Sequence, residues 1–396
     1  MPDLLTVDEA LMRIVEHALL LPVERVPVAD ADGRVAREPA RAVVDLPPFP
    51  SSAMDGFAVR SADTPGDLSI SFRVAAGAAP PGPLPAGAAA GIATGGTVPE
   101  GADAVVPVER VDDTGDRVTV PPVERGQHVR PRGGDVREGD VVVAAGTRLG
   151  PTHVGALSAA GVPDVVCSVR PRVAVLATGS ELRAPGEELA PGQIYESNRA
   201  MIAAALADTG ALVEVLPVAE DDTEAHRAAI TRGLESDVLV TSGGVSMGPH
   251  DLVRGVAAEL GVEEIFWGVA VKPGKPLAFG RRNETLVFGL PGNPVSSLVG
   301  ALVFVGTALR ARQGMERPEP SYLSAVAAAP LRRNPLRDEF VRARRVETSD
   351  GLRLEAIGGQ ESHMIVRAAS ADALIHVSRG DGEIPAGAAV RYLSLD

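Results

Sequence analysis

Two lysines stand three residues apart in the stretch Val271-Lys-Pro-Gly-Lys-Pro276. They are the only lysines of the chain, and the other 36 of its 38 basic residues are arginines. A lysine ammonium is a compact charge with rotatable donors, which suits a small tetrahedral oxyanion or a phosphate. The pair Lys272 and Lys275 therefore predicts an anion site on this Pro-Gly turn. The ordinary alternative, a solvated turn, is weaker here because surface turns elsewhere use arginine.

Three glycine turns follow strands of the expected fold, and they could bind phosphate. Glycine lets the backbone approach a phosphate closely, and the free N–H groups of the next helix supply positive potential. One such turn is weak support, because tight turns need glycine anyway. Three turns at one sheet edge predict a phosphate site, with these residues: Thr178, Gly179, Ser180, Ser242, Gly243, Gly244, Gly292 and Asn293.

Two other motif interpretations are weaker. The lysine turn is not a P-loop, because the Gly-x4-Gly-Lys spacing is absent and Pro276 replaces the required Ser or Thr. The stretch Gly244-Val-Ser-Met-Gly248 matches the nucleophile pattern of serine hydrolases. Pro249, His250 and Asp251 stand where the nucleophile helix should begin, so a ligand-binding loop is the simpler interpretation.

Several carboxylates fall near these turns or in loops. Each of Asp55, Asp135, Glu181, Asp222 and Asp251 is, taken alone, more often a helix cap or a solvated charge. Glu181 and Asp251 follow the glycine turns, where they could hold a Mg²⁺ ion that bridges phosphate oxygens. The seven histidines show no paired spacing and give no zinc signature.

The elements that must position these residues begin with a helix. Residues 6–20 have apolar side chains at helical spacing, and Thr6 with Glu9 forms a capping-box pattern. From Val26 to about Val136 short β-type runs alternate with Pro and Gly clusters, which indicates a small β-rich unit.

From Arg172 onward strands alternate with helices, and the long last helix runs from Pro294 to about Arg312. This pattern predicts a mostly parallel sheet with helices on both faces, whose ligands bind outside the carboxyl ends of the strands. The tail alternates apolar and polar residues. We expect a three-layer doubly wound α/β domain (171–314), an N-terminal region (1–170: 1–45 and 136–170, with an inserted β-rich domain 46–135), and a C-terminal all-β, barrel-like domain (319–396).

Composition excludes several classes of function. A formal net charge of −14 argues against a nucleic-acid-binding surface. The single cysteine, Cys167, excludes a disulfide framework and a cysteine-based zinc site. Residues 1–5 lack a basic n-region, so we expect no signal peptide, and the longest apolar run, about Val295 to Leu309, is too short to cross a bilayer. We expect a cytoplasmic protein with no nucleic-acid or membrane partner.

Eight stretches occur along the chain in a fixed order: 47–59 (Pro-Pro-Phe-Pro-Ser-Ser-Ala-Met-Asp-Gly-Phe-Ala-Val), 93–105 (Ala-Thr-Gly-Gly-Thr-Val-Pro-Glu-Gly-Ala-Asp-Ala-Val), 130–135 (Arg-Pro-Arg-Gly-Gly-Asp), 178–182 (Thr-Gly-Ser-Glu-Leu), 195–198 (Tyr-Glu-Ser-Asn), 242–246 (Ser-Gly-Gly-Val-Ser), 272–276 (Lys-Pro-Gly-Lys-Pro) and 289–296 (Gly-Leu-Pro-Gly-Asn-Pro-Val-Ser). This series resembles the molybdopterin molybdenumtransferase family, the MoeA proteins, which are related to the E domain of gephyrin. The resemblance covers nearly the whole chain.

The resemblance implies a function and an assembly. Such enzymes take molybdopterin adenylate and molybdate, cleave off AMP with Mg²⁺, and place molybdenum on the dithiolene of molybdopterin. They are elongated homodimers, with the active cleft between the α/β domain of one subunit and the small β domain of the other. Molybdopterin adenylyltransferase and downstream cofactor-handling proteins are the partners that the resemblance implies.

The resemblance also assigns roles to residues of this sequence. The residues of this sequence that resemble the family's catalytic polar positions around pterin, adenylate and Mg²⁺ are Asp55, Thr94, Asp135, Glu181, Asp222 and Asp251. The residues that resemble the family's molybdate-binding positions are Lys272, Lys275, Pro276, Ser296, Arg342 and Ser362. The glycine turns would bind the phosphates of molybdopterin and AMP. The stretch Met247-Gly-Pro-His-Asp251 departs from the resemblance, because many relatives have a different turn before the aspartate, and Pro249 has no backbone N–H to contribute.

Two other functions fit part of the sequence. A single-domain adenylyltransferase shares the α/β domain, but the N-terminal region and the C-terminal β domain argue against it. A binding scaffold of the gephyrin kind is disfavoured by the intact lysine pair and acidic residues. Tungstate fits the same pattern as molybdate, because both are similar dianions.

Overall fold

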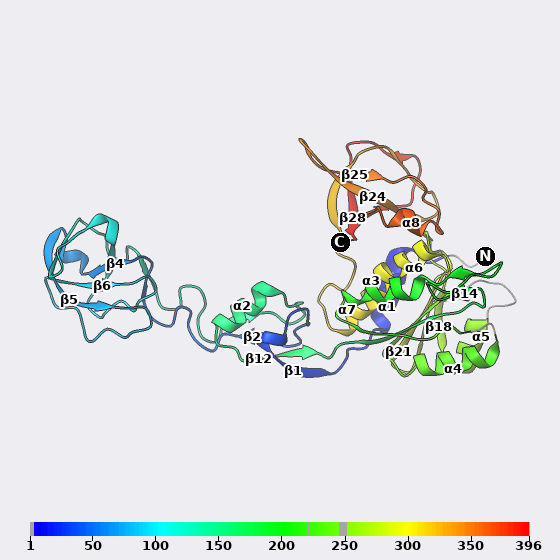
Figure 1. The fold of residues 1–396 in the computed structure, drawn as a ribbon, viewed down its shortest axis with the longest axis horizontal. Coiled ribbons are helices and arrows are strands. Elements are labelled where there is room, and N and C mark those ends of the chain that lie inside the picture. Colours follow the sequence, from blue (N-terminus) through cyan, green and yellow to red (C-terminus); the bar gives the residue numbers. More distant parts are fainter. Residues whose placement is uncertain (1–3, 220–221, 245–251, 396) are drawn as a thin grey trace.

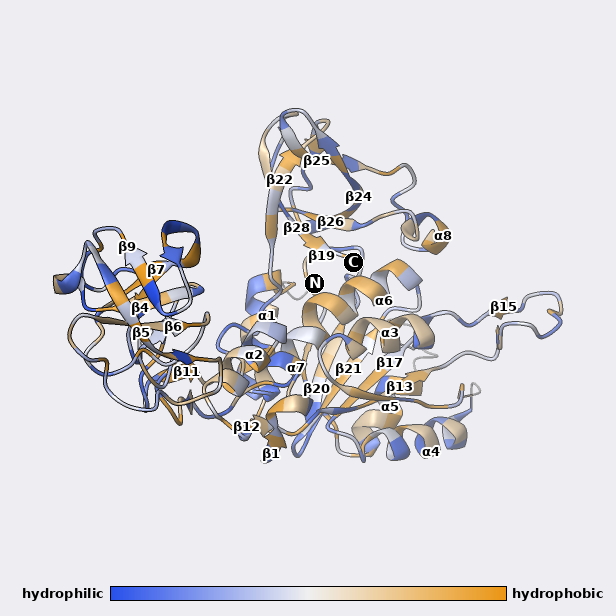
Figure 2. Ribbon diagram, turned by 60° about the vertical axis from the view of Figure 1, so that its left-hand side comes forward, coloured by the Kyte–Doolittle hydropathy of each residue, from blue (hydrophilic) through white to orange (hydrophobic). Residues whose placement is uncertain are grey.

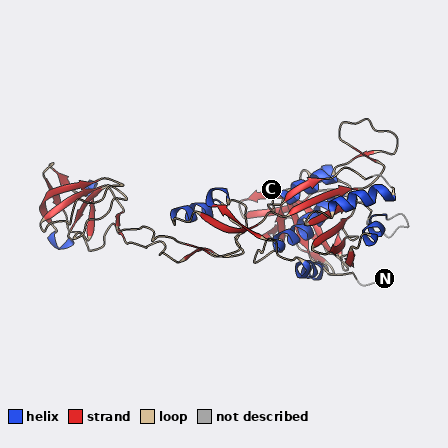
Figure 3. Cartoon of the chain, turned by 90° about the horizontal axis from the view of Figure 1, so that it is seen from below, coloured by secondary structure: helices blue, strands red, loops and turns tan. Residues whose placement is uncertain are grey.

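The computed structural model describes residues 4–219, 222–244 and 252–395. The molecule is elongated, with a small β domain at one end and an α/β domain beside a β-barrel at the other (Figure 1). A slender middle region joins the two ends, as the view from below shows (Figure 3). The predicted fold class, a multidomain α/β plus β chain, is confirmed.

The α/β domain contains the strands β13 (Arg172–Ala177), β16 (Leu212–Val215), β17 (Val238–Ser242), β18 (Glu263–Trp267), β20 (Ala278–Arg282) and β21 (Thr285–Leu290). They form one sheet in the order β16-β13-β17-β21-β20-β18. The first four strands of this order run parallel, and β20 runs antiparallel to both of its neighbours. The carboxyl ends of β13, β17 and β21 therefore meet at one edge, where ligands bind in sheets of this kind.

Helices cover both faces of this sheet: α1 (Val7–His17), α3 (Asn198–Ala207), α4 (Thr223–Gly233), α5 (Leu252–Glu259), α6 (Pro294–Gly300) and α7 (Gly306–Arg312), with the π-helical segment η4 (Ala301–Val305) between the last two. Val173 and Val175 of β13 pack with α1, α3, α6 and α7. Ala174 and Leu176, which alternate with them, pack with α4 and α5 on the opposite face. Burial on both faces explains the continuous apolar run of this strand.

The predicted long helix from Pro294 to Arg312 is present as α6, η4 and α7 in succession. It is long and apolar enough to cross a membrane by length and composition, yet 78% of its most apolar window is buried inside the molecule. Its strongly apolar ribbon lies against the sheet (Figure 2). Packing in the core therefore accounts for its hydropathy.

The predicted capping box at the N-terminus is confirmed. The Glu9 amide donates to Thr6 Oγ1 at 3.1 Å, and the Thr6 amide donates to Glu9 Oε2 at 2.8 Å. The helix ends at His17, earlier than the pattern to residue 20 indicated. Its apolar face, with Ile14 fully buried, packs into the core of the α/β domain, so the chain starts there and then leaves for the middle region.

The middle region is a small core around the short helix α2 (Pro151–Ala159). Two antiparallel pairs frame it: β1 (Val23–Pro27) with β12 (Asp164–Ser168), and β2 (Ala40–Arg41) with β11 (Val141–Val143). The chain goes out and returns through the bridge Leu46 to Val136. Short helical turns η1 (Val28–Asp30), η2 (Ser61–Asp63) and η3 (Val108–Arg110) complete the N-terminal half.

The distal β domain has a six-stranded sheet in the order β7-β4-β6-β5-β9-β8 and a separate pair of short strands. Its strands are β3 (Ser51–Ser52), β4 (Gly56–Val59), β5 (Gly66–Val74), β6 (Ala88–Ile92), β7 (Ala104–Pro107), β8 (Asp112–Asp113), β9 (Arg117–Val120) and β10 (Val129–Arg130). Buried residues on both faces of the sheet make two apolar clusters. This domain therefore has its own core.

The C-terminal domain is a closed barrel, because β24 pairs with β25 on one side and with β26 on the other. Its elements are β22 (Leu323–Ala327), β23 (Leu331–Arg332), β24 (Asp338–Thr348), β25 (Gly351–Ala356), α8 (Ile365–Ala368), β26 (Ala373–Val377), β27 (Glu383–Ile384) and β28 (Ala389–Ser394). The short strand β19 (Val271–Lys272) of the α/β domain pairs with the start of β24. The lysine turn is thereby attached to the barrel.

Candidate functional site

A cavity of about 720 Å³ lies at the carboxyl ends of β13, β17 and β21. Seven of the eight predicted phosphate-binding residues line it: Thr178, Gly179, Ser242, Gly243, Gly244, Gly292 and Asn293. Ser180, the eighth, is exposed on the first turn and is not among the lining residues. The structure thus brings the three glycine turns together around one space.

Two glycines of these turns are required by close approach. Gly244 has φ +63°, and a Cβ built there would lie 2.4 Å from Cγ2 of Val253. Gly243 has φ +96°, and its Cβ would lie 3.0 Å from the carbonyl oxygen of Thr178. Both positions lie in the left-handed region that side chains rarely adopt. The first two turns therefore pack closely where Gly243 meets the Thr178 backbone, and Gly244 packs against Val253 of α5.

The backbone donors of the turns divide into two groups. The N–H groups of Thr178, Gly179 and Gly243 donate to protein carbonyls. Within the described residues, those of Gly244, Gly292 and Asn293 have no protein acceptor. Phosphate oxygens need such donors. The second and third turns therefore supply the free N–H groups of the cavity.

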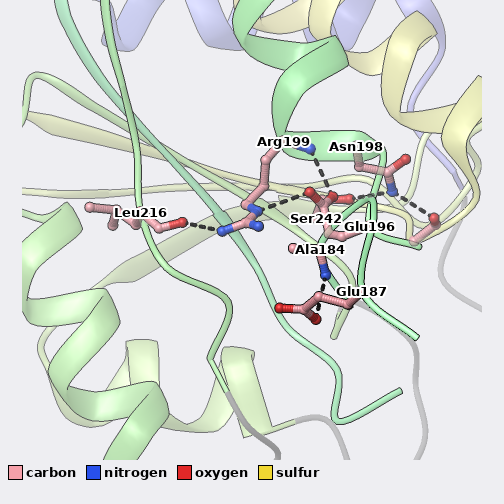
Figure 4. Close-up of polar contacts among 8 residues, drawn as sticks. Ala184, Glu187, Glu196, Asn198, Arg199, Leu216 and Ser242 are labelled. Atoms are coloured by element: carbon pink, nitrogen blue, oxygen red, sulfur yellow. Dashed lines mark hydrogen bonds and ion pairs between the residues drawn. The ribbon is translucent and has the colours of Figure 1, made fainter. Parts of the chain in front are cut away.

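Asn198 joins these two turns from the start of α3 (Figure 4). Its Nδ2 donates to Ser242 Oγ at 2.8 Å and to the Gly292 carbonyl at 2.7 Å. The Ser242 hydroxyl lies 3.3 Å from the Ser297 hydroxyl, which donates to the Pro291 carbonyl. Asn198 is 9% exposed, and its Oδ1 has no hydrogen-bond partner. This amide fixes the distance between the two turns that carry the free donors.

A buried ion pair braces the segment that carries Asn198 (Figure 4). The amide and Nε of Arg199 donate to the Glu196 carboxylate at 2.9 and 3.0 Å. Arg199 Nη1 also donates to the carbonyl of Leu216, at the end of the neighbouring strand. Glu196 lines the cavity, but its charge is already compensated by Arg199. It therefore acts in the wall and is not a free carboxylate.

Glu181 is the carboxylate of the first turn that lines the cavity. It folds back over Gly179, where an added Cβ would lie 2.5 Å from Glu181 Oε2. Asp251, its predicted partner in holding Mg²⁺, lies outside the described residues. No group of three His, Cys, Asp or Glu that could hold a metal occurs in the described part of the chain. One carboxylate on the wall that carries the glycine turns still fits Mg²⁺, which takes few protein ligands alongside phosphate oxygens and water.

The lysine turn lies beside the start of α6. An added Cβ on Gly274 would be 3.6 Å from the carbonyl oxygen of Ser296. Lys272 donates to Glu339 Oε1 of the barrel at 3.1 Å, whereas Lys275 has no side-chain partner in the described ranges. Neither these two lysines nor Pro276 and Ser296 are among the residues that line the 720 Å³ cavity. The lysine turn therefore lies outside this cavity, beside the first turn of α6.

Arg342 and Ser362 are connected through the barrel loop 359–364, which contacts the start of α6. Arg342 is 1% exposed, and its guanidinium donates to the carbonyls of Gly359, Glu361 and Met364 at 2.6, 3.2 and 2.7 Å. Burial lowers the pKa of Arg342 from its ordinary value. The carbonyl of Ser362 accepts the Val295 amide of α6 at 3.0 Å. Arg342 thus supports the loop from inside, and its donors are engaged there instead of facing an anion.

The remaining predicted residues lie elsewhere. Asp55 and Thr94 are brought together, because the Thr94 amide donates to Asp55 Oδ1 at 2.7 Å. This pair belongs to the distal domain, at the far end of the molecule from the cavity (Figure 1). Asp135 lies in the returning segment of the link, where its amide donates to the Leu46 carbonyl at 2.9 Å. Asp222 caps α4 by accepting the Glu224 and Ala225 amides.

Three family models match successive parts of the chain. They describe the MoeA N-terminal region, domains I and II (residues 5–161), a probable molybdopterin binding domain (174–311), and the MoeA C-terminal region, domain IV (324–395). A Mycobacterium tuberculosis protein named molybdopterin molybdenumtransferase 2 is 37% identical over 386 residues, which cover 93% of this chain and 94% of that protein. The Haemophilus influenzae molybdopterin molybdenumtransferase is 33% identical and covers 98% of both chains. The chain belongs to the MoeA family.

Solved structures agree with this assignment. Two structures of a molybdopterin biosynthesis MoeA protein from Pyrococcus horikoshii align with TM-scores of 0.79 and 0.84, at 31% and 28% identity. They cover 100% and 98% of this chain, and 100% and 99% of their own. The expected resemblance is therefore confirmed, and the prediction of an enzyme agrees with the names of the curated relatives.

Several cavity residues of this MoeA-family chain were not predicted as site residues. The stretch Tyr195-Glu-Ser-Asn198 contributed only as a family motif, yet all four of its residues line the cavity. His226 and His363 also line it, from α4 and from the barrel loop. The position of Asn198 at a helix start after a family motif was a usable sign. The two histidines have no sequence pattern that points to the cavity.

Proposed function

We propose that this chain is a molybdenum insertase of molybdenum cofactor biosynthesis. It cleaves AMP from molybdopterin adenylate and transfers molybdenum from molybdate to the dithiolene of molybdopterin. Membership of the MoeA family supports a role in molybdenum cofactor biosynthesis. The observation that carries the finer proposal is the juxtaposition of a three-turn phosphate cavity with a lysine turn at the first turn of one helix.

The phosphate groups of the substrate are assigned to the cavity. The free N–H groups of Gly244, Gly292 and Asn293 would donate to phosphate oxygens, and Asn198 holds these donors at a fixed distance. Backbone donors that are fixed in advance bind a developing charge without reorganisation. Thr178 adds a hydroxyl from the first turn.

Molybdate is assigned to the lysine turn. A tetrahedral dianion needs cations and hydrogen-bond donors in a partly desolvated place. Lys275 has no carboxylate partner in the described ranges and is half-buried, so its charge is available to the anion. We assign Ser296 and Ser362 to the same anion, because Ser296 lies beside Gly274 of the lysine turn and Ser362 is joined to the helix start through the Val295 amide. Tungstate would fit the same donors.

We assign Mg²⁺ to the Glu181 side of the cavity, with Asp251 as a second ligand. When bound, Mg²⁺ would neutralise charge on the phosphoanhydride and polarise it. Glu181 contributes a hard carboxylate oxygen on the wall where phosphate donors converge. Removal of Mg²⁺ by a chelator should therefore stop AMP release, and added Mg²⁺ should restore it.

We further propose that two copies of the chain form the complete site. Asp55 and Thr94 lie far from the cavity of their own chain, so in the catalytic role proposed here they would act on the cavity of a second copy. Asp135 lies where the chain returns from the distal domain, and its amide donates to the Leu46 carbonyl there. We expect the homodimer to work in the cytoplasm, with a molybdopterin adenylyltransferase supplying its substrate.

The test is AMP release from molybdopterin adenylate with and without molybdate. The proposal predicts molybdate-dependent release by the chain and its loss in Lys275→Ala. Arg281→Ala is a matched control, because it removes an exposed cation of the same domain that pairs with Glu263 instead. Absence of molybdate-dependent release by the unaltered chain would exclude an insertase, and adenylate formation from ATP would indicate an adenylyltransferase.

A further inference from the structure

His226 lies in the cavity wall, and no role has been given to it so far. It stands four residues after the cap Asp222 of α4, is 1% exposed, and lines the cavity. Its Nδ1 lies 2.8 Å from the carbonyl oxygen of Asp222. A carbonyl oxygen only accepts, so Nδ1 carries the hydrogen of this bond. The other nitrogen, Nε2, is then an acceptor with a free lone pair in the neutral ring.

Nε2 of His226 has no hydrogen-bond partner within the described residues. It is also not sealed inside the protein. The fully enclosed side-chain atoms without a partner there are Nε of Arg60, Oδ1 of Asn198, Nε of Arg312 and Nε2 of His376. Since the ring lines the cavity and Nε2 is not enclosed, this nitrogen opens towards the cavity. A donor group of a ligand in the cavity would give this nitrogen the hydrogen-bond partner that it lacks.

We propose that His226 is a substrate-binding residue whose Nε2 accepts a hydrogen bond from a hydroxyl or amino group. This inference rests on the proposed function, because molybdopterin adenylate carries ribose hydroxyls and ring amino groups. Phosphate oxygens at neutral pH are acceptors like Nε2, and they go to the free N–H groups of Gly244, Gly292 and Asn293. His226 therefore selects a different part of the ligand from the glycine turns.

The test compares His226→Leu, which keeps the size but has no acceptor, with His226→Gln, which restores one. We expect His226→Leu to raise KM for molybdopterin adenylate about three- to tenfold, the loss of one net hydrogen bond, with kcat within about twofold. His226→Gln should recover part of the loss. His17→Leu is the matched control, because His17 Nδ1 makes the same bond, to the Arg13 carbonyl at 2.7 Å, outside the cavity.

Two results would overturn the inference. One is a KM for His226→Leu within twofold of the unaltered chain. The other is an equal fall in kcat, rise in KM and fall in melting temperature in the Leu and Gln variants, which would show that His226 has a packing role only.

The ring nitrogens give a readout independent of turnover. In a chain labelled with ¹⁵N-histidine, the His226 Nε2 resonance is identified as the one missing from His226→Gln. Addition of AMP should shift this resonance, whereas inorganic phosphate should not. The same shift with phosphate alone, or none with saturating AMP and no change in KM, contradicts the proposal. Molybdate-dependent AMP release by the unaltered chain, together with an unchanged KM in His226→Leu, would refute this inference but not the proposed function.

Discussion

Two substitutions of Asn198 can test whether its amide N–H donors, and not only the volume of its side chain, stabilise the protein. Asn198→Ala removes two hydrogen bonds, of 2.8 and 2.7 Å, worth about 2 kcal/mol together. The same change removes the unpartnered Oδ1, which returns about 1 kcal/mol. The net loss should be about 1 kcal/mol of unfolding free energy.

Asn198→Asp keeps the size of the side chain but reverses the sign of its interaction with Gly292. A carboxylate oxygen would replace Nδ2, which lies 2.7 Å from the Gly292 carbonyl oxygen, in a side chain that is 9% exposed. Repulsion and charge burial should cost about 3 kcal/mol or more. The isosteric variant should therefore be less stable than the truncated one.

The assay is thermal unfolding at neutral pH, where 1 kcal/mol shifts the midpoint by about 2–4 °C for a domain of about 150–250 residues. Asn283→Asp, on an exposed turn, is the control for the added charge and should change little. Burial raises the pKa of an aspartate, so its penalty is present above its unfolded pKa and is relieved as pH falls through the folded value. An unfolding midpoint for Asn198→Asp at or above that of Asn198→Ala would refute the proposal that the Asn198 amide acts as a clamp, joining the turns of Ser242 and Gly292 through its N–H donors.

Four other predictions follow from single contacts. Lys275→Arg should raise the molybdate concentration for half-maximal AMP release about tenfold, and Lys272→Arg should raise it less. Arg342→Met should loosen residues 359–364, seen as faster amide hydrogen exchange there, because the guanidinium no longer binds their carbonyls. Thr6→Ala should cost about 1 kcal/mol of unfolding free energy by loss of the helix cap. Burial raises the pKa of Tyr322 from its ordinary value of 10 to about 12, so stability should fall as pH rises from about 10 to about 12, and an ultraviolet titration should lose this step in Tyr322→Phe.

Much of the fold follows from local pattern. The capping residues Thr6 and Glu9, the strand Arg172–Ala177 and the helix from Pro294 are each specified by neighbours within one or two turns. The placement of α1 against the α/β domain is not specified in that way. It depends on burial of Ile14 among residues from the far half of the chain. The closed barrel likewise depends on β24 pairing with both β25 and β26, which alternation alone does not encode.

The site shows the same division. Glycine spacing was enough to expect the three turns at one sheet edge, because parallel strands end on the same side. The clamp from Asn198 to Ser242 and Gly292 joins residues 44 and 94 positions apart, and periodicity carries no record of such a contact. For Asp222 and Arg342, residue type suggested a contact that the structure does not show. Their types fit the predicted chemistry, but the structure engages Asp222 as a helix cap and Arg342 in holding a loop.

The two lysines are alike in sequence but not in their surroundings, and this difference argues for the order of the two arginine variants. Lys272 donates to Glu339, whose same oxygen accepts Asn334 Nδ2 at 3.1 Å, so it joins the turn to the barrel. An arginine at 272 can still bind that carboxylate, because a guanidinium pairs well with carboxylates. Lys275 has no such partner in the described ranges, so in the proposed function its compact ammonium is available to the molybdate dianion. A broader guanidinium changes that contact directly. Equal impairment at both positions would show that the carboxylate of Glu339 does not separate their roles.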